Sequence, residues 1–403
     1  MATAVLQNQG ILSGLRAPKW AALISVAVAV FVDYLIYGAI VPLTPYSLGG
    51  GGSSSTVSVL YGAYSVGVLL TTPVFGRLGD RAGYRAVMWL AAALGVPAVL
   101  LLWHSDGFVL TLIGRVLQGA ASAATWTAGF ALIAARYPTE RVRMIGLALM
   151  ASTGGSVIGP VMSGALYQIG GYGLPFLILC IFALIDAALR FLLLPKDPPH
   201  KGPTVGVVRL MTDRSVATPA LAVAIAAGAW GILEPTLPRH LEATLGAGAA
   251  EVGLLFTLST IVYGLTSPLV SLVTGRLGMT RTAVTGMVTM AVTLPLLGNS
   301  SAVILSGALL CCVNDGFAFL LNPTSADLGD AVERRGLSCY GAVYAIYNIA
   351  YAVGMMSAST LAASLSDRFS VVQIFLCVGA ILLLCVPLML SAGKRMQPVI
   401  EAE

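Results

Sequence analysis

The dominant pattern in this sequence is a series of long apolar runs separated by short polar segments. The runs fall near residues 21–46, 57–75, 86–103, 108–134, 144–168, 173–194, 216–238, 251–274, 282–298, 302–325, 338–364 and 370–392. The hydrocarbon core of a bilayer is about 30 Å thick, and a helix of about 20 apolar residues crosses it. The pattern therefore predicts an all-α membrane protein with twelve transmembrane helices and both termini on one side of the membrane.

One polar segment is longer than the others and divides the chain. Residues 195–215 follow the sixth run and are rich in proline and charge, which predicts a cytoplasmic central loop between six-helix bundles at 1–194 and 216–403. A weak internal repeat supports the division. "IVPLTP" ends the first run and "ILEPTLP" ends the seventh, and Gly-Arg-Leu-Gly follows both the second and the eighth run. Such parallel halves are a known transporter design, with the substrate site near the midplane between them.

Composition and charge strengthen this interpretation. Only 10% of the residues are charged and 57% are hydrophobic, whereas a soluble domain carries about 25% charged residues. The net charge of +5 comes without the basic clusters that nucleic-acid binding requires. No cleavable signal peptide is expected. With the N-terminus in the cytoplasm, 19 of the 22 Lys and Arg residues lie on the cytoplasmic side, which places both termini there.

The sequence does not predict an enzyme. The six cysteines show no CxxC spacing and are expected to be small core residues without disulfides, and the three histidines lie in or near loops. No GxxxxGK[ST] loop is present, which argues against ATP-driven pumping. We therefore expect no cofactor and no metal site. The "GGGGSSS" stretch at Gly49 to Ser55 is interpreted as an external linker.

Ionisable residues inside the apolar runs are the main candidates for chemistry. They are Asp33, Arg115, Asp186, Glu234 and Asp315. A charge at the bilayer centre costs roughly 2.5–3.5 kcal/mol on insertion scales, so each one indicates a function or a partner. Asp186 lies four residues before Arg190 on one predicted helix, and these two are expected to pair with each other.

Asp33 and Glu234 occupy comparable places in the first runs of the two halves. Burial favours the protonated form of a carboxyl group, and the ionised form can pair with a cationic solute. A carboxylate that binds either a proton or a solute supports exchange. The alternative is that each acid only hydrogen-bonds a neighbouring helix. Arg115 is expected either to neutralise Asp33 or to bond backbone carbonyls.

Aromatic residues are candidates for the wall of a binding pocket. They are Tyr34, Tyr37, Trp126, Trp230, Tyr344 and Tyr347. Their π faces suit an aromatic or cationic solute, at about 0.5–2 kcal/mol for each cation–π contact. For any single one of them, a core or interfacial role is the alternative.

Two glycine-rich stretches predict close backbone contacts. In "GRLGDRAGYR", Gly76, Gly79 and Gly83 permit tight turns, and Asp80 can accept hydrogen bonds from amides at a helix end across the interface between the halves. Its arginines, Arg77, Arg81 and Arg85, either pair with Asp80 or acidic lipids or simply anchor the cytoplasmic side. In the fifth run, Ala151, Gly155 and Gly159 share one helix face, which forms either a generic packing groove or the contact between the halves.

Taken together, these motifs resemble the major facilitator superfamily. "GRLGDRAGYR", the "RVLQG" of Arg115, Gln118 and Gly119, and the two six-helix halves carry the resemblance. "GGSVIGPVMSG", with Gly155, Gly159, Pro160 and Gly164, resembles the antiporter signature of proton-coupled drug exporters. "VDYLIYGAIVPLTPY" and "YGAVYAIYNIAY" are most similar to vesicular amine transporters.

The resemblance implies a proton-coupled antiporter that exports a small organic solute, drug or metabolite, with Asp33 and Glu234 in functional roles and the loop around Asp80 as a cytoplasmic latch. Two departures weaken the case for a monoamine. Tyr64 and Asn348 stand where the amine transporters carry a Lys–Asp pair, which suggests a neutral hydrogen bond, and Asp315 lies about one turn from the family's aspartate.

Other functions stay open at this stage. An organic-anion facilitator or symporter would use Arg115 as the anion partner, and a receptor or sensor of the same fold is disfavoured by the short tails. The expected partners are a small-molecule substrate, protons and the lipid bilayer, and a monomer suffices because one chain contains both halves. The cell membrane is the expected location, with a vesicular membrane as the alternative.

Overall fold

A computed structural model describes residues 20–43, 54–104, 107–196, 206–366 and 368–396, and every regular element in them is a helix. The helices are α2 (Ala21–Leu43), α3 (Ser54–Ala82), α4 (Tyr84–Trp103), α5 (Phe108–Arg136), α6 (Arg141–Gly170), α7 (Gly173–Leu193), α8 (Val207–Met211), α9 (Arg214–Leu245), α10 (Ala249–Leu277), α11 (Met279–Gly298), α12 (Val303–Glu333), α13 (Tyr340–Ser366) and α14 (Val371–Met396). The predicted all-α class is confirmed. The chain ends and most of the expected external linker lie outside the described residues.

Ten of the described helices are long and apolar enough to cross a membrane. They are α2, α4, α5, α6, α7, α9, α10, α11, α12 and α14. Within the described residues, α3 and α13 are not among the helices that meet that criterion. The twelve-span expectation is thus confirmed for ten helices. It stays a prediction for α3 and α13, as does the cytoplasmic placement of both termini.

The helices form two compact units. Unit 1 contains residues 1–206 and 336–348, and unit 2 contains residues 207–335 and 349–403. The first division falls inside the polar segment 195–215. Helix α13 begins in unit 1 and continues in unit 2, a feature that the linear division at 1–194 and 216–403 does not include.

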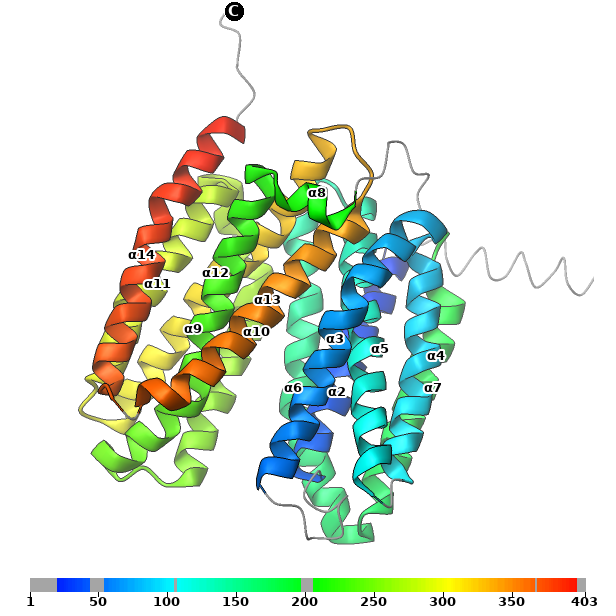
Figure 1. The fold of residues 1–403 in the computed structure, drawn as a ribbon, viewed down its shortest axis with the longest axis horizontal. Helices are drawn as coiled ribbons and strands as arrows, with labels where there is room; N and C mark the ends of the chain where they lie inside the picture. The colour runs from blue at the N-terminus through cyan, green and yellow to red at the C-terminus, as the bar shows by residue number, and fades with distance from the viewer. Residues whose placement is uncertain (1–19, 44–53, 105–106, 197–205, 367, 397–403) are drawn as a thin grey trace, which may run out of the picture. The chain divides into compact units, whose positions relative to one another are not determined.

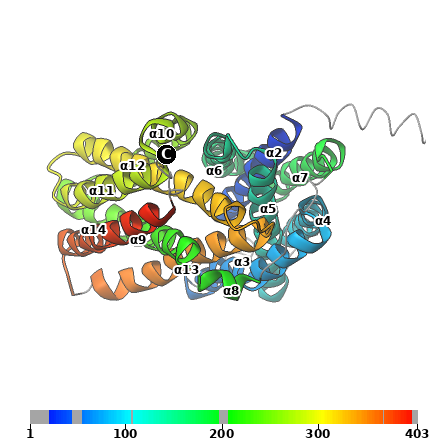
Figure 2. The ribbon, with the colours of Figure 1, turned by 90° about the horizontal axis from the view of Figure 1, so that it is seen from above.

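In unit 1, α2 packs along α6 and also contacts α5 and α7, while α3 and α4 both pack on α5 (Figures 1 and 2). The core beside α2 contains Leu35, Ala39, Phe176 and Leu179, none more than 1% exposed. These side chains bury α2 on the side of α7. In unit 2, α12 packs on α9, α10 and α11, and α14 packs on α9 and α11.

Small residues on α6 let its backbone approach that of α2. A Cβ atom added to Gly155 would lie 2.2 Å from the carbonyl oxygen of Phe31, and one added to Gly159 would lie 2.5 Å from that of Leu35. Glycine is required at both positions because a larger residue forces the helices apart. Both helices belong to unit 1. The packing-groove alternative is therefore confirmed within unit 1, and a role for this face at the contact between the halves stays a prediction.

We predict that Gly155→Ala destabilises the protein by about 1–3 kcal/mol, because the added methyl group would overlap the backbone of α2 at Phe31. The midpoint of thermal unfolding in detergent should fall below that of the wild type. Gly164→Ala is the matched control, since a Cβ at Gly164 on the same helix meets nothing within 4 Å. Equal midpoints for the two variants would contradict the close α2–α6 contact.

Candidate functional site

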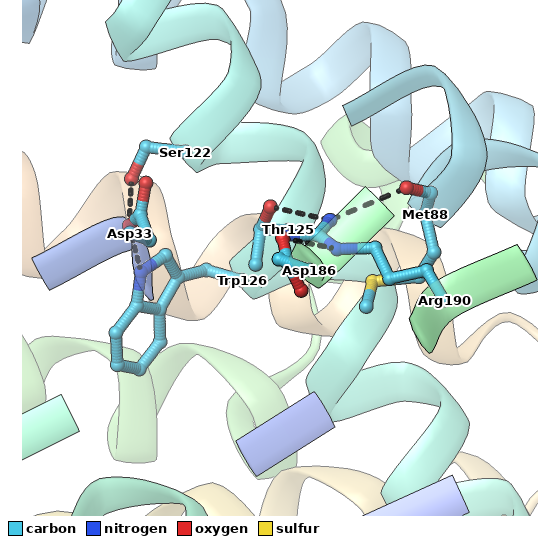
Figure 3. A network of polar contacts seen from close by, with 7 residues as sticks. All are labelled: Asp33, Met88, Ser122, Thr125, Trp126, Asp186 and Arg190. Atoms are coloured by element: carbon cyan, nitrogen blue, oxygen red, sulfur yellow. Dashed lines mark hydrogen bonds and ion pairs between the residues drawn. The ribbon is translucent and has the colours of Figure 1, made fainter. Parts of the chain in front are cut away.

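The carboxylate of Asp33 is held in the interior of unit 1 by two donors from α5. Its Oδ2 accepts hydrogen bonds from Ser122 Oγ at 2.7 Å and from Trp126 Nε1 at 2.9 Å (Figure 3). The Asp33 side chain is partly buried. A carboxylate fixed by two donors in an apolar bundle is oriented to receive either a proton or a cation.

A hydroxyl group from α3 joins this hydrogen-bond network. The hydroxyl of Tyr64 donates to Ser122 Oγ at 2.8 Å, while Ser122 donates to Asp33. The chain of hydroxyls therefore points toward the carboxylate. Ser122 was not among the residues predicted from sequence. Its spacing of four from Gln118 and from Trp126 could have found it, because residues four apart share one helix face.

A cluster of aromatic rings includes Trp126, which donates to this carboxylate. Tyr34 lies 5.3 Å from Trp126 between ring centroids, and Tyr37 lies 6.3 Å from Tyr34 and 4.8 Å from Tyr64. These contacts gather the rings of α2, α3 and α5 beside Asp33. Of the other predicted wall residues, Tyr344 is fully buried against Phe130, and Tyr347 also contacts that ring. In unit 2, Trp230 packs on Phe256 and Phe317.

Arg115 is 1% exposed and takes part in a different set of contacts. Its Nε donates to the carbonyl oxygen of Leu60 at 3.2 Å and its Nη1 donates to Gln118 Oε1 at 2.8 Å. Its guanidinium also lies 5.7 Å from the ring centre of Tyr37 and 5.5 Å from that of Tyr64. Among the described residues Asp33 forms no ion pair with Arg115. The expectation of neutralisation is therefore wrong, and bonding to a backbone carbonyl is confirmed.

The predicted pair between Asp186 and Arg190 is confirmed. Arg190 Nη2 lies 2.6 Å from Asp186 Oδ2, and Nε donates to the same oxygen at 2.8 Å. Arg190 Nη1 also donates to Thr125 Oγ1 at 3.0 Å and to the carbonyl oxygen of Met88 at 3.2 Å (Figure 3). The pair thereby ties α7 to α4 and α5. Asp33, Asp186 and Arg190 line a common small cavity, a proximity that sequence spacing does not reveal.

The remaining predicted site residues lie elsewhere. Asn348 Nδ2 donates to Thr127 Oγ1 at 3.0 Å, while Tyr64 bonds Ser122, so the expected hydrogen bond between Tyr64 and Asn348 is wrong. In unit 2, Glu234 on α9 is exposed and Asp315 on α12 is partly buried. One oxygen of Asp315 has no partner among the described residues. Their functional roles stay predictions.

Asp80 is 6% exposed and caps the beginning of α13. Its carboxylate accepts hydrogen bonds from the backbone amides of Gly341 at 2.7 Å and Ala342 at 2.8 Å, and from the hydroxyl of Tyr84 at 3.0 Å. Asp80 therefore satisfies two amides that a helix N-terminus leaves without partners. The prediction that it accepts amides from a helix end is confirmed. Both of these amides belong to unit 1, as Asp80 does, so a contact across the interface between the halves stays a prediction.

Glycines make this contact possible. A Cβ on Gly76 would lie 2.7 Å from the carbonyl oxygen of Gly341, and Gly83 has a φ of 97°, which favours glycine. Of the nearby arginines, Arg81 is exposed, and the Arg85 guanidinium lies 4.3 Å from the ring centre of Trp89.

Comparisons with known proteins agree with this fold. The model of the Major Facilitator Superfamily matches residues 26–216 and 219–402. The chain is 28% identical over 392 residues to the probable vesicular acetylcholine transporter-B of Danio rerio, covering 91% of this chain and 78% of that protein. It is 28% identical over 309 residues to the chromaffin granule amine transporter of Rattus norvegicus, covering 74% of this chain but only 58% of the rat protein.

A solved structure shows the same architecture. The human organic anion transporter MFSD10 (TETRAN) superposes with a TM-score of 0.75 at 17% identity, over 92% of this chain and 99% of that one. The relatives and the fold are those of transporters and not of enzymes. With ten apolar helices and a family match over most of its length, this chain is a multi-pass membrane protein that belongs to the Major Facilitator Superfamily.

Proposed function

We propose that this protein is a proton-coupled antiporter that exports a small organic cation from the cytoplasm by alternating access. Asp33 is the group that binds either the proton or the cation. The proposal rests on one observation: the Asp33 carboxylate lies within an apolar helix and is oriented by hydrogen bonds from Ser122 and Trp126. An ionisable residue within a membrane span costs free energy of insertion, so its presence there indicates a function.

The two protonation states of Asp33 provide the exchange. In the ionised state Oδ2 keeps its two hydrogen bonds and the negative charge attracts a cation. In the protonated state that charge is absent and the cation loses its partner. Tyr34, Tyr37 and Trp126 offer π faces beside the carboxylate, each worth about 0.5–2 kcal/mol to a cation. The solute therefore leaves when a proton takes its place.

The charge of the solute is argued from the same residues. The names of the two relatives refer to amine and acetylcholine transport, and Asp33 offers a negative charge to such a solute. An organic anion would need Arg115, whose side chain is fully buried and bonded to Leu60 and Gln118. The cation is therefore the better-supported solute. We place the protein in the cell membrane as a monomer, with a vesicular membrane as the alternative.

The experiment is uptake into vesicles that contain the purified protein and hold an acidic lumen. Labelled amines in quaternary ammonium form, which cannot cross the lipid as neutral bases, and labelled organic anions are supplied outside, with and without a proton ionophore. The proposal expects amines to accumulate and the ionophore to abolish their accumulation. Accumulation of anions alone, or of amines regardless of the pH gradient, would overturn it.

Removal of one hydrogen-bond donor should shift the pH dependence of exchange. Ser122 donates to the ionised carboxylate, so Ser122→Ala makes that form less stable and Asp33 keeps its proton to higher pH. A hydrogen bond to a charged group is worth about 1.5–3 kcal/mol, which corresponds to roughly 1–2 pH units. We expect half-maximal amine exchange, at equal pH on both sides, to move to higher pH by that amount.

Ser163→Ala is the control for this variant. Ser163 is buried like Ser122, but it bonds the carbonyl oxygen of Pro160 on its own helix. Its pH profile should match the wild type. Identical profiles for wild type and Ser122→Ala would show that the Ser122 hydrogen bond does not act on the exchanging group.

A further inference from the structure

A small cavity inside unit 1 lies beside Asp33, and the exchange described above assigns it no role. Its volume is about 30 Å³, and residues of α2, α4, α5 and α7 line it. The polar groups on its wall belong to Asp33, Thr125, Asp186 and Arg190, and the rest of the wall is aliphatic. The cavity therefore lies between the proposed proton-binding carboxylate and a buried ion pair.

The two acids on the cavity wall have unused hydrogen-bonding capacity. Asp186 is 4% exposed, and both contacts from Arg190 reach its Oδ2. Its Oδ1 has no partner among the described residues. Likewise, both hydrogen bonds that Asp33 accepts from described residues go to its Oδ2. A buried carboxylate oxygen without a donor is costly, and ordered water is the usual remedy.

We propose that this cavity is a water site shared by Asp33 and Asp186, and that Asp186 and Arg190 are positioning residues that set the pH at which Asp33 takes up its proton. The space suffices for roughly one or two water molecules, and the polar side chains on its wall supply the two to four partners that a buried water needs. This inference rests on the proposed role of Asp33 as the proton-binding group.

The charges around Asp33 determine the sign of the effect. Asp186 and Arg190 of α7 line the same cavity as Asp33, and from α3 the Tyr64 hydroxyl is linked to Asp33 through Ser122. Arg115 of α5 contacts the rings of Tyr37 and Tyr64 instead.

In the wild type the negative charge of Asp186 offsets the positive charge of Arg190. Asp186→Asn removes that offset, while Arg190 keeps its hydrogen bonds to Thr125 and Met88. The uncompensated positive charge then favours ionised Asp33.

The experiment is an infrared titration of the purified protein in lipid nanodiscs. The C=O band of protonated Asp33 is assigned by its loss in Asp33→Asn and then followed with pH. We expect the midpoint in Asp186→Asn to move to lower pH by about one unit. The double variant Asp186→Asn with Arg190→Gln, which has no net charge change at the pair, should return toward the wild-type midpoint. An unchanged midpoint in Asp186→Asn would overturn the electrostatic role.

A second variant tests the water directly and leaves every charge in place. Gly95 and Ala121 both line the cavity, and a Cβ on Gly95 would lie 3.8 Å from Ala121 Cβ, which is an ordinary contact. Gly95→Ala therefore takes up space without a clash. We expect the Asp33 midpoint to move to higher pH, because ionised Asp33 loses its water. Gly253→Ala, whose Cβ meets nothing within 4 Å, is the control and should not shift.

These readouts separate the two proposals. The titration does not require solute flux, so midpoints that shift as expected support the water site even if the vesicles show no coupled uptake. A midpoint that stays at the wild-type value in Gly95→Ala overturns the water site, even if uptake is coupled to the pH gradient.

Discussion

Asp33→Asn is expected to abolish accumulation of a quaternary amine against a concentration gradient. Asparagine has nearly the same shape as aspartate and keeps an oxygen that accepts from Ser122 and Trp126, but it cannot ionise. Exchange of one proton for one solute across a gradient of one pH unit sustains roughly tenfold accumulation, since each pH unit is worth 1.36 kcal/mol. In Asp33→Asn vesicles the ratio of inside to outside solute should fall to about one.

Two further variants show whether the loss is specific. Asp33→Glu keeps an ionisable group and should retain part of the accumulation. Glu234→Gln and Asp315→Asn test the two acids of unit 2 separately. Glu234 is exposed and Asp315 is partly buried. A loss of accumulation in either variant would assign that acid a role in transport. Normal accumulation by correctly inserted Asp33→Asn would remove Asp33 from the mechanism.

Asp80→Ala is expected to release the beginning of α13 from α3. The substitution removes the acceptor of the Gly341 and Ala342 amides, two hydrogen bonds to a charged group. At about 1.5 kcal/mol each, their loss amounts to about 3 kcal/mol, or roughly a hundredfold in an equilibrium between attached and released states. Cys339, which is fully buried beside this contact, should become reactive to a maleimide.

The labelling is measured in a chain whose other five cysteines are replaced by serine or alanine. We expect the rate at Cys339 to rise up to a hundredfold in Asp80→Ala, within the limit set by exposure of the thiol. Arg81→Ala is the matched control, because Arg81 is the next residue but is exposed. If Cys339 reacts equally slowly in all three proteins, the hydrogen bonds of Asp80 do not hold this segment.

The helices were predictable because lipid leaves few alternatives. A run of apolar residues in a bilayer must satisfy its own backbone, and a helix does so within one segment. The apolar runs therefore predict the helices, α3 and α13 included. The pairing of Asp186 with Arg190 was equally accessible, because a spacing of four residues puts them on one helix face.

Contacts between helices were less predictable from one sequence. Arg115 and Asp33 are opposite charges, so pairing seemed the natural outcome, but Arg115 bonds its neighbours Gln118 and Leu60. Ser122 looks like any small residue in an apolar run until α2 is packed on α5. The same holds for Gly155, whose partner helix is set by tertiary packing and not by its motif. Pattern identifies a helix face, and only packing identifies what that face meets.

The central claim is that a solute and a proton exchange at Asp33, and proton movement itself tests it most directly. Vesicles containing the protein and a pH-sensitive dye in the lumen start with equal pH on both sides. A permanently charged quaternary ammonium that the protein accumulates is then added outside, because such an ion cannot carry protons by crossing the lipid as a neutral base. We predict that the lumen of wild-type vesicles becomes alkaline as the ammonium enters and that the lumen of Asp33→Asn vesicles does not. Ammonium entry without alkalinisation in the wild type, or equal alkalinisation in both proteins, would contradict the account.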